Sequence, residues 1–422
     1  MTEVTATFRS DIAMSLEEYV SGVRTTTTQG SERASEPETS DNLIAKAQEL
    51  APLLAKHADE ASRLTRPVDE VIAALEEAGM FGLTAPRSRG GAQVPLQAFI
   101  TIGEELAKGC ASTSWVTSIY NGGIFMMCTF PDRALDEVYA EGTPRVCSNF
   151  NPAGQAVPVD GGYRLSAAWR FCSGQHHANW GLMASFITRE GCDPEPAMFM
   201  VRRSDMTAAD DWHVSGLRGS ASNTLSTEDL FVPEHMVQPV AVSAMGGSAS
   251  ESLGSDSYFR MPNVPFFTAG ATGAPLGMAA AALEIFSSRI HKRGITYTPY
   301  AKQSDAVVTH LQMDEAIMKL DEARFHAQRS ADTALEVSVN LADVASRVRI
   351  RSDAAWCFKR CREVVEIVRQ AAGASALHVS NPLGRIVDDI EALSVHSFLI
   401  FSTNAELHGR VRCGLPPDVP YF

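Results

Sequence analysis

The chain has 422 residues, of which 45% are hydrophobic and 20% are charged, a composition typical of a globular protein with a large buried core. This length predicts two or three domains. Fifty acidic and 36 basic side chains give a formal net charge of −14, which disfavours nucleic acid or an anionic membrane as a partner. An anionic small substrate stays open, because a local pocket can oppose the overall field.

The eight cysteines include no CxxC pair and no Cys/His cluster at zinc spacing, so we expect no metal site and a reducing, cytoplasmic compartment. Residues 1–40 contain no apolar segment of the signal-peptide kind and are interpreted as a flexible N-terminal extension. The uncharged run 264–283 carries Pro265 and Pro275, which favours a closely packed helix over a membrane span.

Helical periodicity dominates residues 41–145, which we interpret as an N-terminal α-helical domain. Apolar residues of the first helix recur at spacings of three and four: Leu43, Ala47, Leu50, Leu54, Ala58 and Ala61. Asp41 is its predicted N-cap, and a second helix is expected to begin near Pro67 and end at Gly79. A third helix is predicted over 96–109, and a fourth begins near Trp115.

The periodicity changes to two in residues 163–171, as a half-buried strand requires. Asp160-Gly161-Gly162 directly before it supplies a hairpin turn. Further strands are expected at 181–188, 196–202 and 225–232. Residues 146–240 are therefore predicted to form a β-barrel domain or a small sandwich.

Residues 241–261 are rich in glycine and serine and predict a flexible linker or loop. Four helices are expected after it, which would form a C-terminal helical bundle over 262–422. Their predicted ranges are 269–293, 302–335, 340–373 and 385–408. An order of α, then β, then α-bundle is found in few enzyme families.

The motifs of several common enzyme classes are missing from the sequence. There is no GxGxxG after a strand, no GxxxxGK[ST], no GxSxG and no HExxH. A nicotinamide site of the usual fold is therefore not expected.

Several segments resemble the acyl-CoA dehydrogenase superfamily, and especially its flavin-dependent monooxygenase branch. Trp169-Arg170-Phe171-Cys172-Ser173-Gly174, followed by His177-Ala178-Asn179-Trp180, is similar to the W-x-F-x-S-G-x-x-H-A-x-W stretch of that branch. Residues 216–222 and 231–234 resemble its G-x-R-G-T-G-S and V-P-E segments, and Pro382-Leu383-Gly384-Arg385 with His396 resembles its closing helix. The resemblance covers residues 42–420. It implies an α+β fold with an N-terminal α-helical domain, a central β-barrel and a C-terminal four-helix bundle.

The same resemblance implies the oxygenase component of a two-component aromatic hydroxylase or N-oxygenase. Such an enzyme takes reduced flavin, FMN or FAD, from a separate NAD(P)H-dependent flavin reductase. It uses O2 to oxygenate a small aromatic or polyketide-type substrate through a C4a-(hydro)peroxyflavin. A flavin site shared between subunits implies a homotetramer or at least a homodimer.

Residue roles follow from the matched motifs. Ser173 is expected at flavin N5 and His396 as an acid–base group facing the pocket, both counted as catalytic. The residues expected to contact the cofactor are Ser148, Trp169, Ser173, Ser222, Arg293 and Gln370. The residues expected to line the substrate pocket are Trp115, Asn121 and His396. From the pattern alone, Ser173 could equally be a strand-end hydroxyl, and His396 a structural residue of an amphipathic helix.

An acyl-CoA dehydrogenase or oxidase acting on a CoA thioester is the alternative function. Two aligned positions argue against this alternative function. Ser402 falls where the dehydrogenase I-Y-E-G-T-S-E-I segment has its catalytic glutamate. Glu406 aligns with a glutamate of that segment that is not catalytic. Gly123 stands where many monooxygenases have a second histidine, and Asp388 where an arginine often follows the closing-helix arginine. A CoA-bound substrate, and a flavin-free scaffold that kept only the fold, also stay open.

Overall fold

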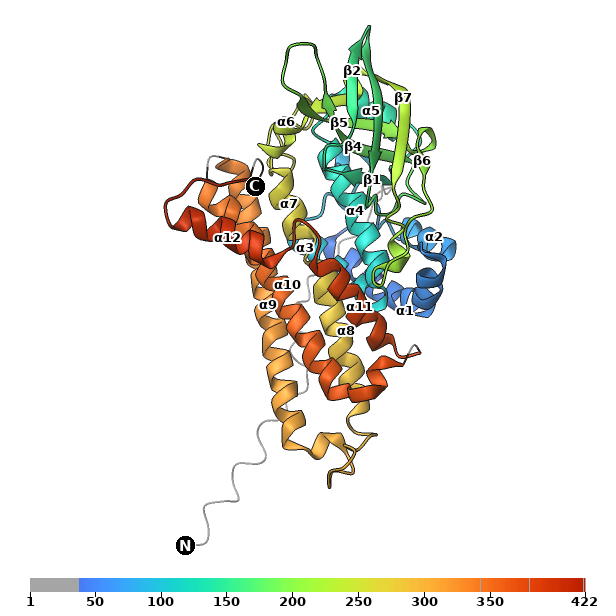
Figure 1. Cartoon of the computed structure of the whole chain (residues 1–422), viewed down its shortest axis with the longest axis vertical. Coiled ribbons are helices and arrows are strands. Elements are labelled where there is room, and N and C mark those ends of the chain that lie inside the picture. The colour runs from blue at the N-terminus through green and yellow to red at the C-terminus, as the bar shows by residue number, and fades with distance from the viewer. Residues whose placement is uncertain (1–37, 342, 379, 420, 422) are drawn as a thin grey trace, which may run out of the picture. The chain divides into compact units, whose positions relative to one another are not determined.

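The computed structural model describes residues 38–341, 343–378, 380–419 and 421. The predicted extension 1–40 lies outside these residues except for its last three. Helices, then a β-sheet, then long helices follow one another along the chain, which confirms the predicted order of classes (Figure 1).

The helices before the sheet are α1 Ser40–Leu64, α2 Asp69–Glu77, α3 Leu96–Gly109, α4 Ala111–Met127 and α5 Asp132–Tyr139, with a short 3-10 turn at Arg87–Arg89. Thr39, and not Asp41, caps α1: its side chain accepts a hydrogen bond from the backbone N–H of Asn42. α2 begins two residues after Pro67. α4 begins four residues before Trp115, and all of its residues are buried, so no change of amphipathic pattern marks its start.

The central strands are β1 Val146–Asn149, β2 Gln155–Val159, β3 Gly162–Trp169, β4 Trp180–Ile187, β5 Glu195–Arg202, β6 Thr207–Ala208, β7 Leu225–Pro233 and β8 Val237–Pro239. They form one eight-stranded sheet in the order β6-β7-β3-β2-β4-β5-β8, and β1 pairs in parallel with β4. β2 and β3 form the hairpin expected around the Asp160-Gly161-Gly162 turn.

The strand predicted over 163–171 is two residues too long. β3 ends at Trp169, and Phe171 has a φ of 65° and is 64% exposed. The chain leaves the sheet here because Cys172 N–H donates to the carbonyl of Asn223 and Gly174 N–H donates to the carbonyl of Ser220. These hydrogen bonds to the loop before β7 replace the strand-to-strand hydrogen bonds that a longer β3 would make. No local sequence pattern reveals them.

The glycine- and serine-rich segment 241–261 is packed onto the N-terminal helices. It begins in helix α6 Val240–Ala244, and Leu253 within it is buried. The Asp132 carboxylate of α5 accepts hydrogen bonds from the Ser250 hydroxyl at 2.5 Å and the Ser252 hydroxyl at 2.8 Å. The segment is therefore a loop held by specific contacts and not a spacer between domains.

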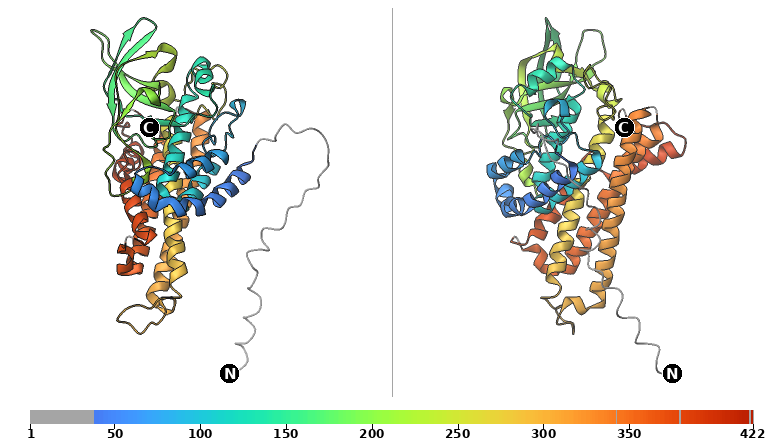
Figure 2. Two further views of the ribbon diagram at one scale, coloured as in Figure 1. Left: turned by 90° about the vertical axis from the view of Figure 1, so that its right-hand side faces the viewer. Right: turned by 180° about the vertical axis from the view of Figure 1, so that it is seen from behind.

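The C-terminal helices are α7 Asn263–Gly270, α8 Gly273–Arg289, α9 Val307–Val339, α10 Val344–Ala372, α11 Pro382–Ser394 and α12 Phe401–Arg412. α8, α9, α10 and α11 lie side by side as a bundle (Figures 1 and 2). The helix predicted over 385–408 is two helices joined by a turn. Asn404 holds this turn, because its Nδ2 donates to the carbonyls of Phe398 and Ile400 at 2.9 Å each.

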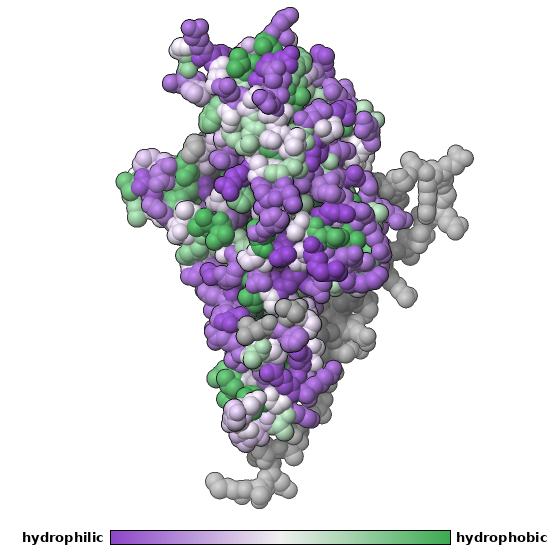
Figure 3. All heavy atoms as spheres, turned by 45° about the vertical axis from the view of Figure 1, so that its right-hand side comes forward, coloured by the Kyte–Doolittle hydropathy of each residue, from purple (hydrophilic) through white to green (hydrophobic). Residues whose placement is uncertain are grey.

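The stretch Asn263–Arg289, which contains α7 and α8, is long and apolar enough to cross a membrane, but 94% of its most apolar window is buried inside the structure. That burial is expected of a core helix. Polar side chains dominate the face of the molecule in Figure 3, and apolar ones lie among them in small patches.

Gly277 lets α8 approach α3 closely, because a Cβ there would lie 2.2 Å from the carbonyl oxygen of Glu104. Gly277→Ala should therefore lower the free energy of unfolding by about 1–3 kcal/mol or more, measured as a drop in Tm. Gly409→Ala is the matched control on α12, where no atom lies within 4 Å of the new Cβ. It should stabilise the helix by about 0.5–1 kcal/mol. An unchanged Tm for Gly277→Ala would show that the two helices do not depend on this contact.

Candidate active site

Three serine hydroxyls meet where the segment after β3 contacts the segment before β7. Ser173 Oγ lies 2.7 Å from Ser222 Oγ, which lies 2.6 Å from Ser220 Oγ. All three side chains are buried. We call Ser173, Ser220 and Ser222 the serine cluster; it presents hydroxyls that donate and accept hydrogen bonds.

The backbone around Ser173 is fixed from two sides. The N–H of Gly174 donates to the carbonyl of Ser220 at 2.7 Å, and the Tyr120 hydroxyl of α4 donates to the carbonyl of Gly174 at 2.5 Å. Gly174 has a φ of 76°, and a Cβ there would lie 2.7 Å from the Tyr120 ring. Glycine is therefore required directly after Ser173.

Five aromatic rings pack together next to the serine cluster: Trp115, Phe150, Phe267, His396 and Phe398. The imidazole of His396 lies 5.2 Å from the Trp115 ring, 6.2 Å from Phe267 and 6.0 Å from Phe398, measured between centroids. Phe150 lies 5.6 Å from Phe267. This aromatic cluster comes from α4, the residue after β1, α7 and the α11–α12 turn.

One hydrogen bond joins the two clusters: the indole Nε1 of Trp115 donates to Ser173 Oγ at 3.2 Å. A molecule held against the aromatic rings would thus lie beside the hydroxyls. The structure brings together four of the predicted site residues at this point, namely Trp115, Ser173, Ser222 and His396.

His396 lies in the turn between α11 and α12, and not on a helix as predicted. Burial lowers the pKa of its imidazole to about 4, so the ring is neutral at pH 7. Its Nδ1 accepts a long hydrogen bond of 3.4 Å from the backbone N–H of Phe398, and its Nε2 has no partner among the described residues. A neutral imidazole with one available nitrogen can exchange a proton with a bound ligand.

Ser148 on β1 is also suited to a ligand, because its hydroxyl is buried and has no hydrogen-bond partner in the described part of the chain. Trp169, by contrast, has no free polar group to offer a ligand. Its ring is buried in the sheet, and its Nε1 donates to the carbonyl of Ala184 at 2.6 Å.

Asn121 faces away from the aromatic cluster, into the N-terminal helical layer. Its Nδ2 donates to the carbonyls of Met80 and Thr117 at 2.8 and 2.9 Å, and its Oδ1 accepts from the Thr84 backbone N–H at 3.2 Å. With these bonds made, the amide connects helices and has no group left for a substrate.

Arg293 follows the C-terminal end of α8, and Gln370 lies near the C-terminal end of α10. Both helices end on the side of the bundle away from the sheet (Figure 1). The Arg293 guanidinium donates to the carbonyl of Ala372 at 2.8 Å and to Ser375 Oγ at 2.6 Å. Gln370 is exposed and donates to Glu366. Within one chain these two residues are not brought to the serine cluster.

Two departures from the family pattern have a structural basis. A Cβ at Gly123 would lie 2.7 Å from the carbonyl oxygen of Val146, so β1 fills the space that a histidine at 123 would need. Ser402 and Glu406 are exposed on α12, and the aromatic cluster contains no carboxylate. The cluster therefore lacks the carboxylate base that the dehydrogenase I-Y-E-G-T-S-E-I segment supplies.

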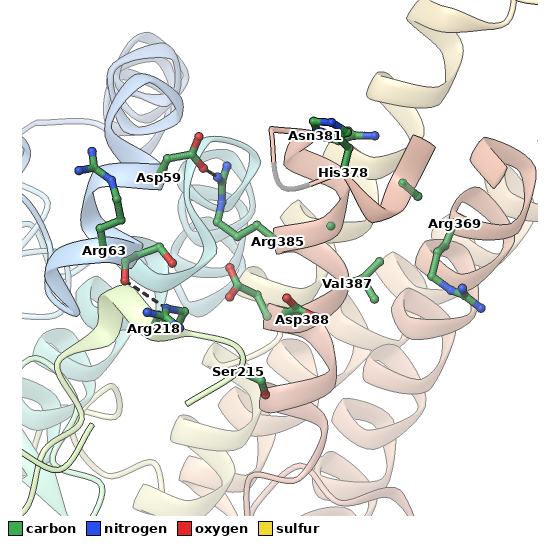
Figure 4. A pocket seen from close by; sticks show the side chains of 14 residues that line it. Asp59, Arg63, Ser215, Arg218, Arg369, His378, Asn381, Arg385, Val387 and Asp388 are labelled. Carbon is green, nitrogen blue, oxygen red and sulfur yellow. Dashed lines mark hydrogen bonds and ion pairs between the residues drawn. The ribbon is translucent and has the colours of Figure 1, made fainter. Parts of the chain in front are cut away.

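Sequence reasoning missed Phe150, Phe267 and Phe398, which come from three segments without a shared motif. It also missed a polar pocket of about 560 Å3 between α1, α11 and the segment 215–218. Figure 4 shows Arg385 of α11 pointing toward Asp59 of α1, with which it forms an ion pair.

The buried Asp389 carboxylate holds one wall of this polar pocket. It accepts a hydrogen bond from the N–H of Leu217 at 2.6 Å, and burial raises its pKa to about 6. The bond fixes the start of the segment that carries Ser220 and Ser222 onward to the serine cluster.

Family models, similar sequences and similar solved structures all point to the same protein family. The family described as "Acyl-CoA dehydrogenase, N-terminal domain" matches residues 44–140, and "Acyl-CoA dehydrogenase, C-terminal domain" matches residues 269–401. A pigment production hydroxylase of Rhodococcus sp. is 28% identical over 90% of this chain and 99% of its own length. The flavin-dependent monooxygenase oxygenase subunit HsaA of Mycobacterium tuberculosis is 29% identical over 89% of this chain and 96% of its own.

Among solved structures, XiaF from Streptomyces sp., in complex with FADH2 and glycerol, superposes with a TM-score of 0.85. It is 26% identical over 91% of this chain and 98% of its own. The helix–sheet–helix fold expected from the motifs is thereby confirmed. The chain belongs to the acyl-CoA dehydrogenase superfamily, on the branch whose members are oxygenase components of flavin-dependent monooxygenases.

Proposed function

We propose that this chain is the oxygenase component of a two-component flavin-dependent monooxygenase. It takes reduced flavin from a separate NAD(P)H-dependent reductase and inserts one oxygen atom of O2 into a small aromatic or polyketide-type substrate. The observation that carries the proposal is the Trp115–Ser173 hydrogen bond, which places an aromatic cluster directly against a group of buried hydroxyls.

The residues around Ser173 fit a flavin. The buried hydroxyl of Ser148 has no protein partner, and the serine cluster can donate to or accept from the polar edge of a flavin ring. When bound, reduced flavin supplies the electrons that activate O2. Ser173 would hold the flavin at N5, and Ser222, whose hydroxyl lies 2.7 Å from that of Ser173, would orient the Ser173 hydroxyl. We infer FAD as the flavin, because one relative is named an FADH2-dependent resorcinol hydroxylase and XiaF was solved with FADH2.

The aromatic cluster holds the substrate ring and keeps water from the reacting atoms. His396 would accept a hydrogen bond from a phenol or amine of the substrate and would be the group that receives its proton. Its neutral ring suits that task, because an imidazolium could not accept a proton. The acyl-CoA dehydrogenase alternative is disfavoured, because Ser402 and Glu406 point to solvent.

We further propose that copies of the chain associate through α9, as a homotetramer or homodimer, in the cytoplasm. Leu311, Met318 and Phe325 lie seven residues apart along α9, and each is more than half exposed. Apolar side chains at this spacing form one stripe that a second helix can cover. Arg293 and Gln370 would then be available to flavin bound by a neighbouring copy.

The first prediction is that the chain consumes O2 only when a flavin reductase, flavin and NAD(P)H are all present, because it has no nicotinamide motif of its own. An oxygen electrode with resorcinol as the probe substrate measures this. Rapid oxidation of NADH by the chain with flavin but without reductase would contradict the two-component proposal. Bleaching of oxidised flavin by an acyl-CoA without oxygen would favour the dehydrogenase instead.

Ser173→Ala should leave the fold intact and divert oxygen into hydrogen peroxide. Loss of one hydrogen bond of about 0.5–1.5 kcal/mol changes the ratio of peroxide to product several-fold. The matched control is Ser330→Ala on α9, where the hydroxyl bonds only to the Ala327 carbonyl of its own helix. An equal peroxide ratio in both variants would return Ser173 to a structural role.

Titration of His396 in the flavin-free protein should have its midpoint near pH 4, because burial disfavours the charged ring. NMR signals of the imidazole, assigned by their loss in His396→Asn, report this directly. Since the unfolded chain binds this proton with a pKa of about 6.5, His396 lowers stability progressively as the pH falls from about 6.5 to 4. A midpoint at or above 6.5 would rule out a desolvated ring.

Association through α9 predicts that Leu311→Glu with Phe325→Glu lowers the mass in solution, as measured by size-exclusion chromatography with light scattering. Val157→Glu on β2 replaces another exposed apolar side chain, 44% exposed and away from α9, and should leave the mass unchanged. An α9 variant that keeps the wild-type mass would place the interface elsewhere.

A further inference from the structure

A narrow apolar cleft of about 10 Å3, room for roughly one water-sized group, continues from the aromatic cluster. Trp115 and Phe267 belong to both the cluster and the cleft. The complete lining is Phe99, Trp115, Ser118, Gly122, Phe266, Phe267, Gly270 and Ala271. None of these residues is charged.

Ser118 brings an unpartnered hydroxyl to this cleft. It lies on the α4 face shared by Trp115 and Gly122, since the three positions are separated by three and four residues. The side chain is 6% exposed and makes no hydrogen bond within the described residues. By contrast, the neighbouring hydroxyl of Thr117 bonds to the carbonyl of Thr113 at 3.0 Å.

Asn263 brings an unpartnered amide to the same side of α7. Phe266, Phe267 and Gly270 follow it by three, four and seven residues, which places Asn263 on the helix face that lines the cleft, one turn further along. The residue is 5% exposed, and neither Nδ2 nor Oδ1 has a hydrogen-bond partner among the described residues. Buried amides are normally bonded, so this one requires an explanation.

Among the described residues, the lining of the cleft contains no cation. The arginine that touches the aromatic cluster, Arg351, lies over the Phe398 ring at 5.9 Å. Its guanidinium already donates to Asn404 Oδ1 at 2.8 Å and to the carbonyl of Tyr421 at 3.2 Å. A carboxylate entering the cleft would lose its hydration without gaining an ion pair.

We propose that Asn263 and Ser118 bind a neutral, hydrogen-bonding substituent of the substrate, such as an amide, ketone or hydroxyl, at the end remote from the oxygenated carbon. The inference rests on the proposed function, because it takes the aromatic cluster as the seat of the substrate ring. Gly122 contributes by leaving space beside the Phe267 ring, because a Cβ there would lie 3.2 Å from that ring.

Three phenols that differ only at the para position test this: 4-hydroxybenzamide, 4-ethylphenol and 4-hydroxybenzoate. Their affinities are measured by calorimetry on the full chain loaded with oxidised FAD. The wild type should bind the amide about tenfold more tightly than 4-ethylphenol. Asn263→Leu should remove this preference, and Ser118→Ala should reduce it about threefold. Thr117→Val, which changes a hydroxyl already bonded within α4, should preserve it.

Thermal unfolding separates recognition from a structural role. Because Asn263 has no partner in the protein, Asn263→Leu should keep or raise the Tm of the ligand-free chain. Asn263→Ala serves as a second variant if leucine overfills the site. A preference that survives in both variants, a lowered Tm in both, or tightest binding of 4-hydroxybenzoate would overturn the inference. A preference lost in Asn263→Leu, without oxygenation of any phenol by the reductase-coupled wild type, would uphold this binding site and overturn the proposed function.

Discussion

The hydrogen bond from the Trp115 indole to the Ser173 hydroxyl is the contact on which the site depends. It connects α4, a fully buried helix of the N-terminal layer, with the loop that leaves the sheet after β3. Neither partner can move alone, because Tyr120 of the same helix holds the carbonyl of Gly174 and Ser220 holds its N–H. The backbone of the loop is thus fixed in the unliganded chain, which reduces the ordering that a cofactor would have to impose.

Burial sets the charge states of two side chains on either side of the segment 216–222. On the aromatic side, burial without a counter-charge lowers the pKa of His396 to about 4 and keeps it neutral. On the polar-pocket side, burial raises the pKa of Asp389 to about 6, while its carboxylate binds the backbone at Leu217. Desolvation disfavours the charged form in both cases, so it moves an acid and a base in opposite directions. The aromatic side consequently holds a neutral imidazole near pH 7, which can accept a hydrogen bond from a ligand.

The succession of helices, sheet and bundle could be predicted from periodicity and glycine-rich turns, because each element is long and patterned. The contiguous W-x-F-x-S-G stretch also pointed to Ser173, which lies in the serine cluster and bonds to Trp115. The errors lie where distant contacts override local pattern. No proline or glycine marks the break before α12, which Asn404 creates by binding the carbonyls of Phe398 and Ile400, and so His396 was wrongly expected on a helix.

The ring partners of His396 could not be predicted for a similar reason. Phe150, Phe267 and Phe398 meet only after three segments fold together, and each alone resembles an ordinary core residue. The unpartnered amide of Asn263 is also invisible to sequence, because a missing hydrogen bond is a property of the packed structure. By contrast, Gly123 was noticed as a departure from the family, and the packing of α4 on β1 explains it.

A crystal structure of the full chain with bound FAD and a phenol would show directly where the flavin and the substrate ring bind. We expect flavin N5 within hydrogen-bond distance of Ser173 Oγ and the phenol ring among Trp115, Phe267 and His396. A flavin ring bound elsewhere, for example in the polar pocket beside Arg385, with the Trp115–Ser173 and Ser173–Ser222 contacts unchanged, would contradict this expectation.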